Sequence, residues 1–384
     1  MASSLSKTCG TFRHDAEFSL AGGASLAGYQ LAYETYGELN AAGSNAILVF
    51  HALTGSQNAA GETLAVDGVG DRWTEDCRCG WWDGFIGPGR ALDTDQHFVI
   101  CANYLGGCYG STGPSSIDPA TGKPYGSQFP RIAIRDIVDS HLPLLDHLGI
   151  GKLHAAVGGS VGGMLCISLS TRHPDRVSHV VPIASGIAPS QLHRLHNFEQ
   201  VLAIESDANF NGGDYYDGEP PLQGLALARM IQHKTFISLA AMESRARGEA
   251  QQPENRQGWY MIRHALESYM VHQGRKFRDR FDANSYLRII DAWQSYDACA
   301  EVGVDDVSKL FAACQGQRYL QFSIDSDVCF YPEDQTHIAS ALNASGIPNM
   351  HLTVHSEKGH DSFLLEPELY TPHLSYALQG GPVS

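Results

Sequence analysis

The sequence predicts an α/β fold in which a mostly parallel central sheet is interrupted once by a helical insertion. Short apolar runs of the kind that form strands buried on both faces alternate with longer segments of helical periodicity. A long middle stretch has helical patterns and no buried strand. The 40 glycines among 384 residues indicate many tight turns, which favours this class over a helical bundle.

Apolar runs predict the strands of the first part of the sheet. Phe18–Leu20 and Gln30–Tyr36 alternate enough to be expected as an antiparallel pair at its start. The parallel strands are expected at Ala46–His51, His97–Ala102, Leu153–Val157 and His179–Ala184.

Two segments with helical periodicity, Ile132–Leu148 and Val161–His173, are expected to cover this sheet. The Pro- and Gly-rich stretch from Gly106 to Pro130 contains no periodic element. Such a long irregular connection in a compact domain is typical of an ordered, functional loop.

After Ser185 the pattern changes to amphipathic segments separated by polar, glycine-rich linkers. These segments are Gln191–Glu205, Gly224–Arg247, Gln257–Tyr269 and Ala283–Tyr296. The later elements are strands at Gln317–Ile324 and Met350–Val354 and helices at Glu333–Ala344 and Leu369–Leu378. We therefore expect residues 1–187 and 306–384 to form the α/β core, and residues 188–305 to form a helical cap.

Composition excludes several classes of function. The net charge of -16 argues against nucleic-acid binding, because no basic patch could neutralise phosphates. No run reaches the roughly 18 apolar residues of a membrane span, and the first residues lack the pattern of a signal peptide. The 9 cysteines lack paired spacing, which favours free thiols and a cytoplasmic protein. Cys77-x-Cys79 has no second pair downstream, so no metal site is expected.

Gly158-Gly159-Ser160-Val161-Gly162 is the most informative motif of the chain. It joins an apolar strand to a helix, as a nucleophile elbow requires: the serine sits on a sharp turn where small neighbours let the backbone pass. The helix start places N–H groups and the positive end of the helix dipole beside Ser160. We expect Ser160 to be a nucleophile.

A nucleophilic serine needs a base and an acid that orients the base. In doubly wound hydrolases these follow the serine in the order acid, then histidine, each after a strand. His360 lies behind the last predicted strand. Asp325 and Asp327 both end the strand before it, so the pattern leaves the choice of acid open.

The second donor to an oxyanion is expected from the loop after an early strand. Ala46–His51 runs into Ala52-Leu53-Thr54-Gly55, whose small residues permit close backbone approach. The amide of Leu53 or its neighbour is predicted to pair with that of Val161.

The elbow and several other segments resemble the homoserine O-acyltransferase family, a branch of the α/β-hydrolase fold. The resemblance runs from about residue 15 to residue 375, and the run Asn103–Ser116 is its most specific part. The matching segments are His51–Gly55, Trp81–Asp83, Gly87–Gly89, Asn103–Ser116, Gly158–Met164, Ala228–Ile231, Phe281–Leu287 and Gly359–Leu364. Gln232 departs from the family, which often has glycine there.

The resemblance implies that Ser160 takes an acyl group from acyl-CoA and passes it to the γ-hydroxyl of L-homoserine, for methionine synthesis. It implies that Asp327 rather than Asp325 is the acid. It nominates Arg229 for the acceptor carboxylate and Asp361 for its ammonium group, and it gives Phe236 no polar role. A helical cap that keeps water from the acyl-serine fits this chemistry.

Two positions favour acetyl over succinyl as the transferred group. Succinyl-using members carry arginine two residues after the acid, where this chain has Cys329, and Thr54 resembles the acetyl users. Acetyl-CoA is then the co-substrate and no further cofactor is expected. The family also implies a homodimer formed through the cap helices. The alternatives are a succinyltransferase, a serine O-acyltransferase, an esterase with the same triad, and an inactive binding protein.

Overall fold

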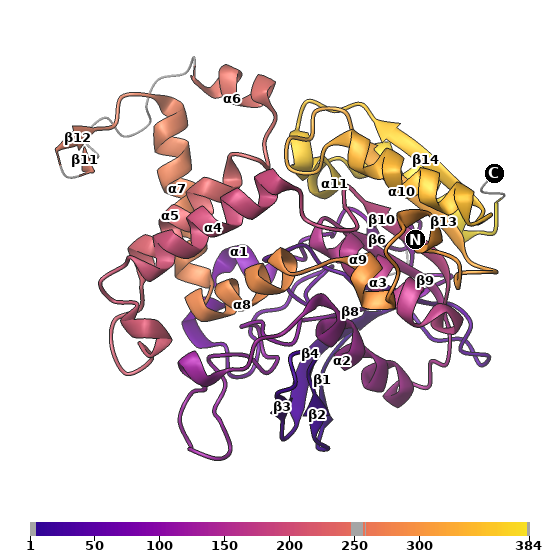
Figure 1. The fold of residues 1–384 in the computed structure, drawn as a ribbon, viewed down its shortest axis with the longest axis horizontal. Helices are drawn as coiled ribbons and strands as arrows, with labels where there is room; N and C mark the ends of the chain where they lie inside the picture. Colours follow the sequence, from indigo (N-terminus) through magenta and orange to yellow (C-terminus); the bar gives the residue numbers. More distant parts are fainter. Residues whose placement is uncertain (1–4, 247–255, 258, 382–384) are drawn as a thin grey trace.

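The computed structural model describes residues 5–246, 256–257 and 259–381 and contains an eight-stranded sheet (Figure 1). The two pairings that involve β4 are antiparallel and the others are parallel, which confirms the predicted class. In spatial order the strands are β1 (Lys7–His14), β4 (Tyr29–Tyr36), β8 (Phe98–Ala102), β5 (Ala46–Phe50), β9 (Leu153–Gly159), β10 (Val177–Ile183), β13 (Arg318–Ile324) and β14 (Asn349–Val354).

The expected pairing at the start of the sheet is wrong. β4 pairs with β1, whereas β2 (Phe18–Ser19) pairs with β3 (Ser25–Leu26) in a separate short hairpin. β1 is an edge strand on which Phe12 alone is buried, so it has no apolar run that a pattern search would find.

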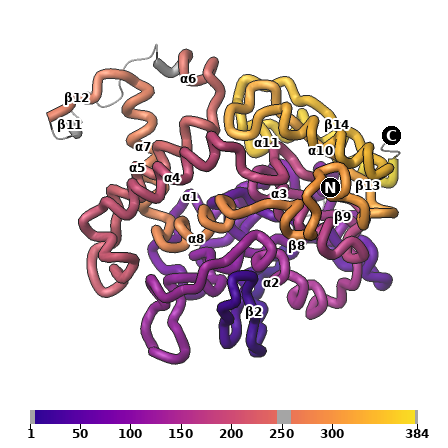
Figure 2. The backbone as a smooth tube through the Cα atoms, in the orientation of Figure 1, coloured from indigo at the N-terminus to yellow at the C-terminus, as the bar shows by residue number. Residues whose placement is uncertain are grey.

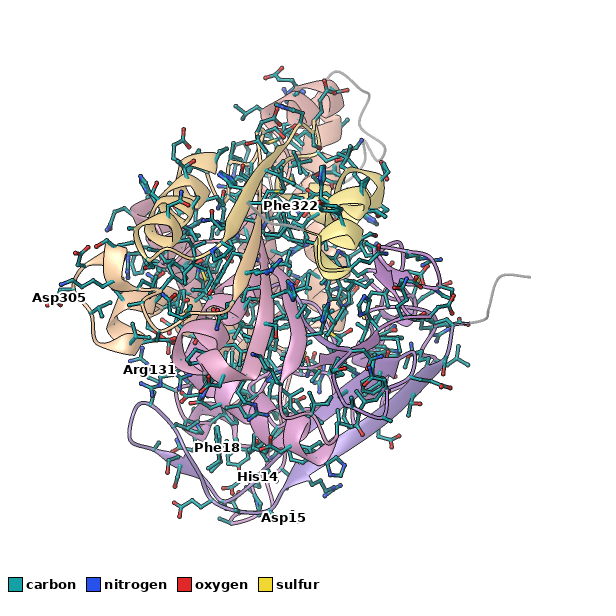
Figure 3. All side chains as sticks on the ribbon, turned by 90° about the vertical axis from the view of Figure 1, so that its right-hand side faces the viewer. His14, Asp15, Phe18, Arg131, Asp305 and Phe322 are labelled. Carbon is teal, nitrogen blue, oxygen red and sulfur yellow. The ribbon has the colours of Figure 1, made fainter. Side chains whose placement is uncertain are left out.

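Helices cover both faces of the sheet, and each face has its own apolar core. α2 (Ile134–His147), α3 (Val161–Arg172) and α10 (Pro332–Ala344) pack into one core, and α12 (Pro367–Leu378) packs into the other. Figure 3 shows Phe322 of β13 among the packed side chains beside the C-terminal helices, where its ring lies 5.2 Å from that of Tyr370.

A group of helices between β10 and β13 stands to one side of the sheet, and Figure 2 shows the chain leaving the sheet there and returning to it. We call this group the cap. Its helices are α4 (Gln191–Glu205), α5 (Leu222–His233), α6 (Leu239–Ala246), α7 (Ala265–Arg280) and α8 (Ala283–Gln294), and the short α9 (Ala298–Val302) that follows packs back against α3, where Ser168 Oγ donates to Glu301. The remaining short elements are α1 (Glu75–Arg78), β6 (Ile86–Gly87), β7 (Leu92–Asp93), β11 (Arg256–Gln257), β12 (Tyr260–Met261) and α11 (Ser362–Leu365).

Two of the expected cap helices differ from the structure. The segment predicted as one helix at Gly224–Arg247 is two, α5 and α6, and Arg247 lies outside the described residues. The helix predicted at Gln257–Tyr269 begins only at Ala265, because the Glu267 carboxylate accepts the N–H groups of Arg263 and His264 and fixes the start there. No helix in the described parts of the chain is long and apolar enough to cross a membrane.

Candidate active site

Ser160 occupies the sharp turn between β9 and α3, with φ 59° and ψ −126°. This positive φ is a strained conformation for a residue other than glycine and costs about 1–3 kcal/mol. A Cβ atom at Gly162 would overlap the carbonyl of Phe50, and one at Gly163 would lie 2.5 Å from Cβ of Ser185. The glycines of the motif are therefore required for the backbone to pass this closely.

The backbone of Ser160 is fixed from both sides. Its N–H donates to the carbonyl of Ile183 (2.9 Å), and its carbonyl accepts from Gly163 N–H (3.0 Å) and Ser185 Oγ (2.7 Å). The Ser160 hydroxyl forms no hydrogen bond with another described residue, so the turn holds the side chain in place while its oxygen stays available.

His360 lies in the loop after β14 and contacts Asp327, which follows β13. His360 Nδ1 is 2.7 Å from Asp327 Oδ2, and the two side chains are 3% and 0% exposed. Asp327 Oδ1 accepts the N–H groups of Cys329 (2.7 Å) and Phe330 (2.9 Å). Because the carboxylate accepts the hydrogen of Nδ1, the lone pair is on Nε2, which is buried and has no partner among the described residues.

Asp325, the other acid that the sequence left open, points away from this site. Its carboxylate lies at the surface, 2.7 Å from Nδ1 of His355, and accepts the N–H of Ser356. The geometry brings only Asp327 to His360.

The imidazole of His360 stacks against two phenyl rings. Phe236 from the cap lies 5.8 Å away at an interplanar angle of 27°, and Phe330 lies 5.5 Å away at 26°. Phe236, for which the sequence indicated packing only, thus packs against the imidazole.

The cap is also hydrogen-bonded to the histidine loop. The carbonyl of Phe236 accepts Asp361 N–H (3.1 Å), and Ser238 Oγ donates to the carbonyl of Glu357. A Cβ atom at Gly359, where φ is 71°, would lie 2.5 Å from Ser238 N, so only glycine permits this close approach. We call this set of contacts the cap latch.

Two backbone N–H groups are placed as possible oxyanion donors. Val161 is the first residue of α3, where an N–H group has no partner within the helix. Leu53 lies in the turn Ala52–Gly55, which the N–H of Gly55 closes onto the carbonyl of Ala52 (3.0 Å). In the described part of the chain neither the Leu53 nor the Val161 N–H is used in another hydrogen bond.

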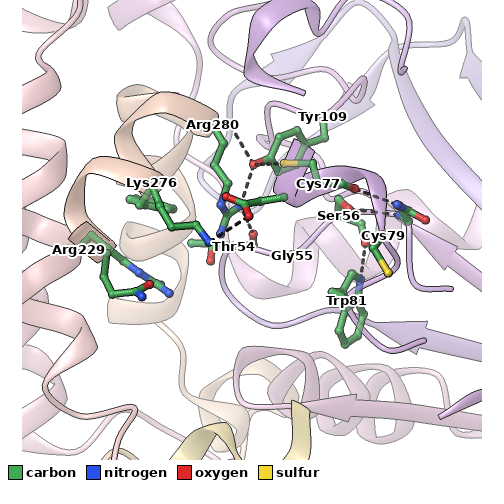
Figure 4. A pocket seen from close by; sticks show the side chains of 14 residues that line it. Thr54, Gly55, Ser56, Cys77, Cys79, Trp81, Tyr109, Arg229, Lys276 and Arg280 are labelled. Carbon is green, nitrogen blue, oxygen red and sulfur yellow. Dashed lines mark hydrogen bonds and ion pairs between the residues drawn. The ribbon is translucent and has the colours of Figure 1, made fainter. Parts of the chain in front are cut away.

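A cavity of about 290 Å³ lies between the cap helices α5 and α7 and the loop that carries Leu53 (Figure 4). Its lining contains three cations, Arg229, Lys276 and Arg280. Lys276 pairs with Asp76 at 3.0 Å. The Arg229 guanidinium forms no hydrogen bond or ion pair with a described residue and lies over the rings of Phe236 (5.0 Å) and Phe277 (5.2 Å).

The charge of Arg229 is destabilised where it stands. Burial lowers the pKa of Arg229 and the nearby charge of Arg280 lowers it further, whereas the carboxylate of Asp361 acts in the opposite direction. A cation in this position is suited to an anionic ligand. Arg229 and Asp361, which the resemblance nominated as a pair, therefore lie within electrostatic reach of one another.

Sequence reasoning missed two further features of the site. Arg280 lines the same cavity and contacts the Leu53 turn. Gln232 Nε2 lies 4.0 Å from Sγ of Cys329, which is two residues after Asp327. Burial raises the pKa of the Cys329 thiol, which keeps it neutral. Arg280 immediately precedes the family-like segment Phe281–Leu287, and this adjacency was the only feature of the sequence that could have pointed to Arg280.

Known proteins resemble this chain along most of its length. Residues 45–367 match the family model described as alpha/beta hydrolase fold. A homoserine O-acetyltransferase of Methanosphaerula palustris is 43% identical over 97% of this chain and 72% of its own length. A homoserine O-succinyltransferase of Alkalilimnicola ehrlichii is also 43% identical, over 93% of this chain and 91% of its own.

Solved structures of known proteins share the fold of this chain. A homoserine O-acetyltransferase from Bacillus anthracis superposes with a TM-score of 0.87 at 25% identity, covering 98% of this chain and 99% of its own. An esterase superposes with a TM-score of 0.85 at 25% identity, covering 97% and 100%. Acyltransferases and an esterase therefore share this architecture.

Proposed function

Because this chain belongs to the homoserine O-acyltransferase family of the α/β-hydrolase fold, we propose that it transfers an acetyl group from acetyl-CoA to the γ-hydroxyl of L-homoserine. The product would be O-acetyl-L-homoserine, an intermediate for methionine synthesis. The reaction proceeds in two steps through an acyl group on Ser160, with no cofactor beyond the co-substrate.

In the first step Ser160 Oγ attacks the thioester carbonyl while His360 Nε2 accepts the hydroxyl proton. The N–H groups of Leu53 and Val161 stabilise the oxyanion. Asp327 holds the imidazole in the required tautomer and stabilises its protonated form. Collapse of the tetrahedral intermediate breaks the C–S bond, and His360 returns the proton to the departing thiolate.

In the second step the γ-hydroxyl of L-homoserine attacks the acyl carbonyl, and His360 again accepts a proton and passes it to Ser160 Oγ. Arg229 binds the acceptor carboxylate through its planar fork, and Asp361 binds the ammonium group. The observation that favours a transferase over a hydrolase is Arg229, a cation that forms no ion pair with a described residue and lines a cavity beside the turn that carries Leu53.

The side chains next to Asp327 favour acetyl over succinyl. A succinyl group ends in a carboxylate, which needs a cation within hydrogen-bond reach in a dry pocket. Cys329, at the position where the resemblance places arginine in succinyl-using members, is buried and neutral, and so is the nearby Gln232.

A single assay separates the candidates. We expect acetyl-CoA to release free thiol at a steady rate only when L-homoserine is present, and we expect L-serine and succinyl-CoA to give lower kcat/KM. Steady release without an acceptor would instead indicate the esterase function that one structural neighbour bears. A preference for succinyl-CoA, whose acyl group is the one in the name of the Alkalilimnicola relative, would refute the acetyl assignment and leave the triad unaffected.

The acting species is proposed to be a cytoplasmic homodimer. All 9 cysteines are free, as in a reducing compartment. Four large apolar side chains follow one another along α4 and are 40–54% exposed: Leu192, Leu195, Phe198 and Leu202. A second copy of the cap would bury this stripe. Sedimentation of the wild type and of Phe198→Glu tests this, and a monomeric wild type would contradict it.

A further inference from the structure

Arg280 is the last residue of α7 and reaches from the cap to the turn that carries Leu53. Its Nη1 donates to the carbonyl of Thr54 (3.1 Å) and to the hydroxyl of Tyr109 (2.8 Å). The Tyr109 hydroxyl in turn donates to the carbonyl of Arg280 (2.9 Å). Figure 4 shows the side chain between Tyr109 and the Thr54–Gly55 segment.

The Thr54–Gly55 peptide is bonded at both ends. Its carbonyl accepts from Arg280, and its N–H, which belongs to Gly55, donates to the carbonyl of Ala52 (3.0 Å). That carbonyl belongs to the peptide whose N–H is the amide of Leu53. In a trans peptide the C=O and N–H point in opposite directions, so the two peptides connect the guanidinium to the Leu53 N–H.

This chain of hydrogen bonds has a charge at one end. Each peptide group that accepts a hydrogen bond at its carbonyl becomes a stronger donor at its own N–H, because hydrogen bonds in series polarise one another. The positive charge of Arg280 therefore makes the Leu53 N–H a better donor and fixes the plane in which it points.

A second side chain acts on the same carbonyl but adds no charge. His51 Nδ1 donates to the carbonyl of Ala52 (2.7 Å), and the imidazole is stacked on Tyr104 at 3.6 Å. Burial lowers the pKa of His51 to about 3, so this ring stays neutral. Within the described residues, Arg280 is thus the only charged side chain hydrogen-bonded to this turn.

We propose that Arg280 is a positioning residue for the oxyanion hole, acting on the Leu53 N–H through the Thr54–Gly55 and Ala52–Leu53 peptides. The inference rests on the proposed function only in taking Leu53 as an oxyanion donor. It makes a cap helix part of the machinery for both chemical steps, because both steps form an oxyanion at the same place.

The test compares Arg280→Met, Arg280→Lys and a matched control, Arg278→Met. Arg278 is a cation on the same helix that pairs with Asp279 (3.3 Å), lies outside the cavity lining and makes no bond to the turn. We expect Arg280→Met to lower the rate constant of acylation by acetyl-CoA about 10-fold, to lower kcat with L-homoserine by the same factor and to leave the KM for L-homoserine unchanged. Arg280→Lys should restore most of the loss, and Arg278→Met should match the wild type.

A further readout separates this role from simple support of the fold. Butylboronic acid forms a tetrahedral adduct with a nucleophilic serine and places an oxygen in the oxyanion hole. Its affinity should fall in Arg280→Met by the same factor as the acylation rate. If Arg280→Met does not fold, Arg280→Gln, which keeps an N–H donor without the charge, is measured in its place.

Two results would overturn the proposal. A raised KM for L-homoserine with unchanged acylation would make Arg280 an acceptor-binding residue. Unchanged acylation and unchanged boronic acid affinity would make it a structural residue only. The acylation rate and the boronic acid affinity require no acceptor, so a wild type that proves to be an esterase would refute the proposed function and leave these two measurements intact.

Discussion

The candidate site has two parts: the triad of Ser160, His360 and Asp327, which we call the triad end, and the cavity around Arg229, which we call the cavity end. They differ in how many of their polar groups form hydrogen bonds or ion pairs within the protein. At the triad end, Asp327 accepts three hydrogen bonds and the backbone of Ser160 is bonded on both sides. At the cavity end, Arg229 forms no ion pair within the described residues, and a second arginine lies nearby. The triad end is complete without substrate, whereas Arg229 at the cavity end is available to an anionic ligand.

This difference separates the groups that carry out chemistry from those that select the substrate. Substitutions at the triad end should reduce the rate of every reaction, whatever the acceptor. Substitution of Arg229 at the cavity end should change which acceptor is used and leave acylation intact, whereas Arg280, which contacts the Leu53 turn, should affect acylation.

The largest effect is expected for Ser160→Ala. Triad members act as a unit, so the variant should lose about a millionfold in kcat while it retains the cap and the cavity. Mass spectrometry of wild type quenched with acetyl-CoA should locate the acetyl group on the peptide that contains Ser160. An acetylated peptide without Ser160 would contradict the assignment.

The choice between the two aspartates gives the next largest effect. Asp327→Asn should lower kcat about ten-thousandfold, because an amide N–H facing His360 favours the wrong tautomer. Asp325→Asn is the matched control, since it removes only a surface contact with His355, and its kcat should stay near that of the wild type. The reverse order of the two kcat values would refute the assignment of Asp327 as the acid that orients His360.

At the cavity end, Arg229→Ala should raise the KM for L-homoserine about 100-fold, as expected for the loss of a charge-assisted pair. The burst of thiol released by acetyl-CoA should be unchanged. With 3-aminopropan-1-ol, which lacks the carboxylate, the variant and the wild type should behave alike. Loss of the burst would move Arg229 to the donor side of the reaction.

The smallest effect concerns the acid stability of the fold. Burial lowers the pKa of His141 to about 4, as it lowers that of His51 to about 3, from an ordinary value of 6.5. The unfolded chain therefore binds protons that the folded chain does not, so this stability is complete above pH 6.5 and is lost as the pH falls toward 4. Each histidine should remove about 1.4 kcal/mol of unfolding free energy per pH unit.

Urea unfolding at pH 7.5, 6 and 5 measures this slope, and His141→Asn should reduce it by one proton. An unchanged slope in this variant would show that His141 is protonated within the fold. Activity at these pH values is a separate quantity and does not enter the test.

The triad end was largely predictable from sequence because local rules specify it. An elbow needs small residues around Ser160, and a strand must precede each partner, so the pattern of apolar runs and glycines located Ser160 and His360. The choice between Asp325 and Asp327 was different. Both lie at the end of one strand, and only the direction of the chain after it brings Asp327 to the imidazole.

The cavity end was less predictable because tertiary contacts define it. α7 is a strongly polar helix in which only Gly274 and Phe277 are buried, so its start at Ala265 was missed, and with it the position of Arg280 at its end. Arg280 acts on Thr54, which is 226 residues away in the chain. No periodicity in the sequence reports a contact over that separation.

The cap latch links the activity of this protein to the local stability of one connection. Phe236 and Ser238 lie between α5 and α6, and they hold the loop that carries His360. Segments at the edge of a domain open at lower free energy than a central sheet does. Heating should therefore inactivate the protein before the sheet melts, and on cooling activity should return as soon as this connection closes again.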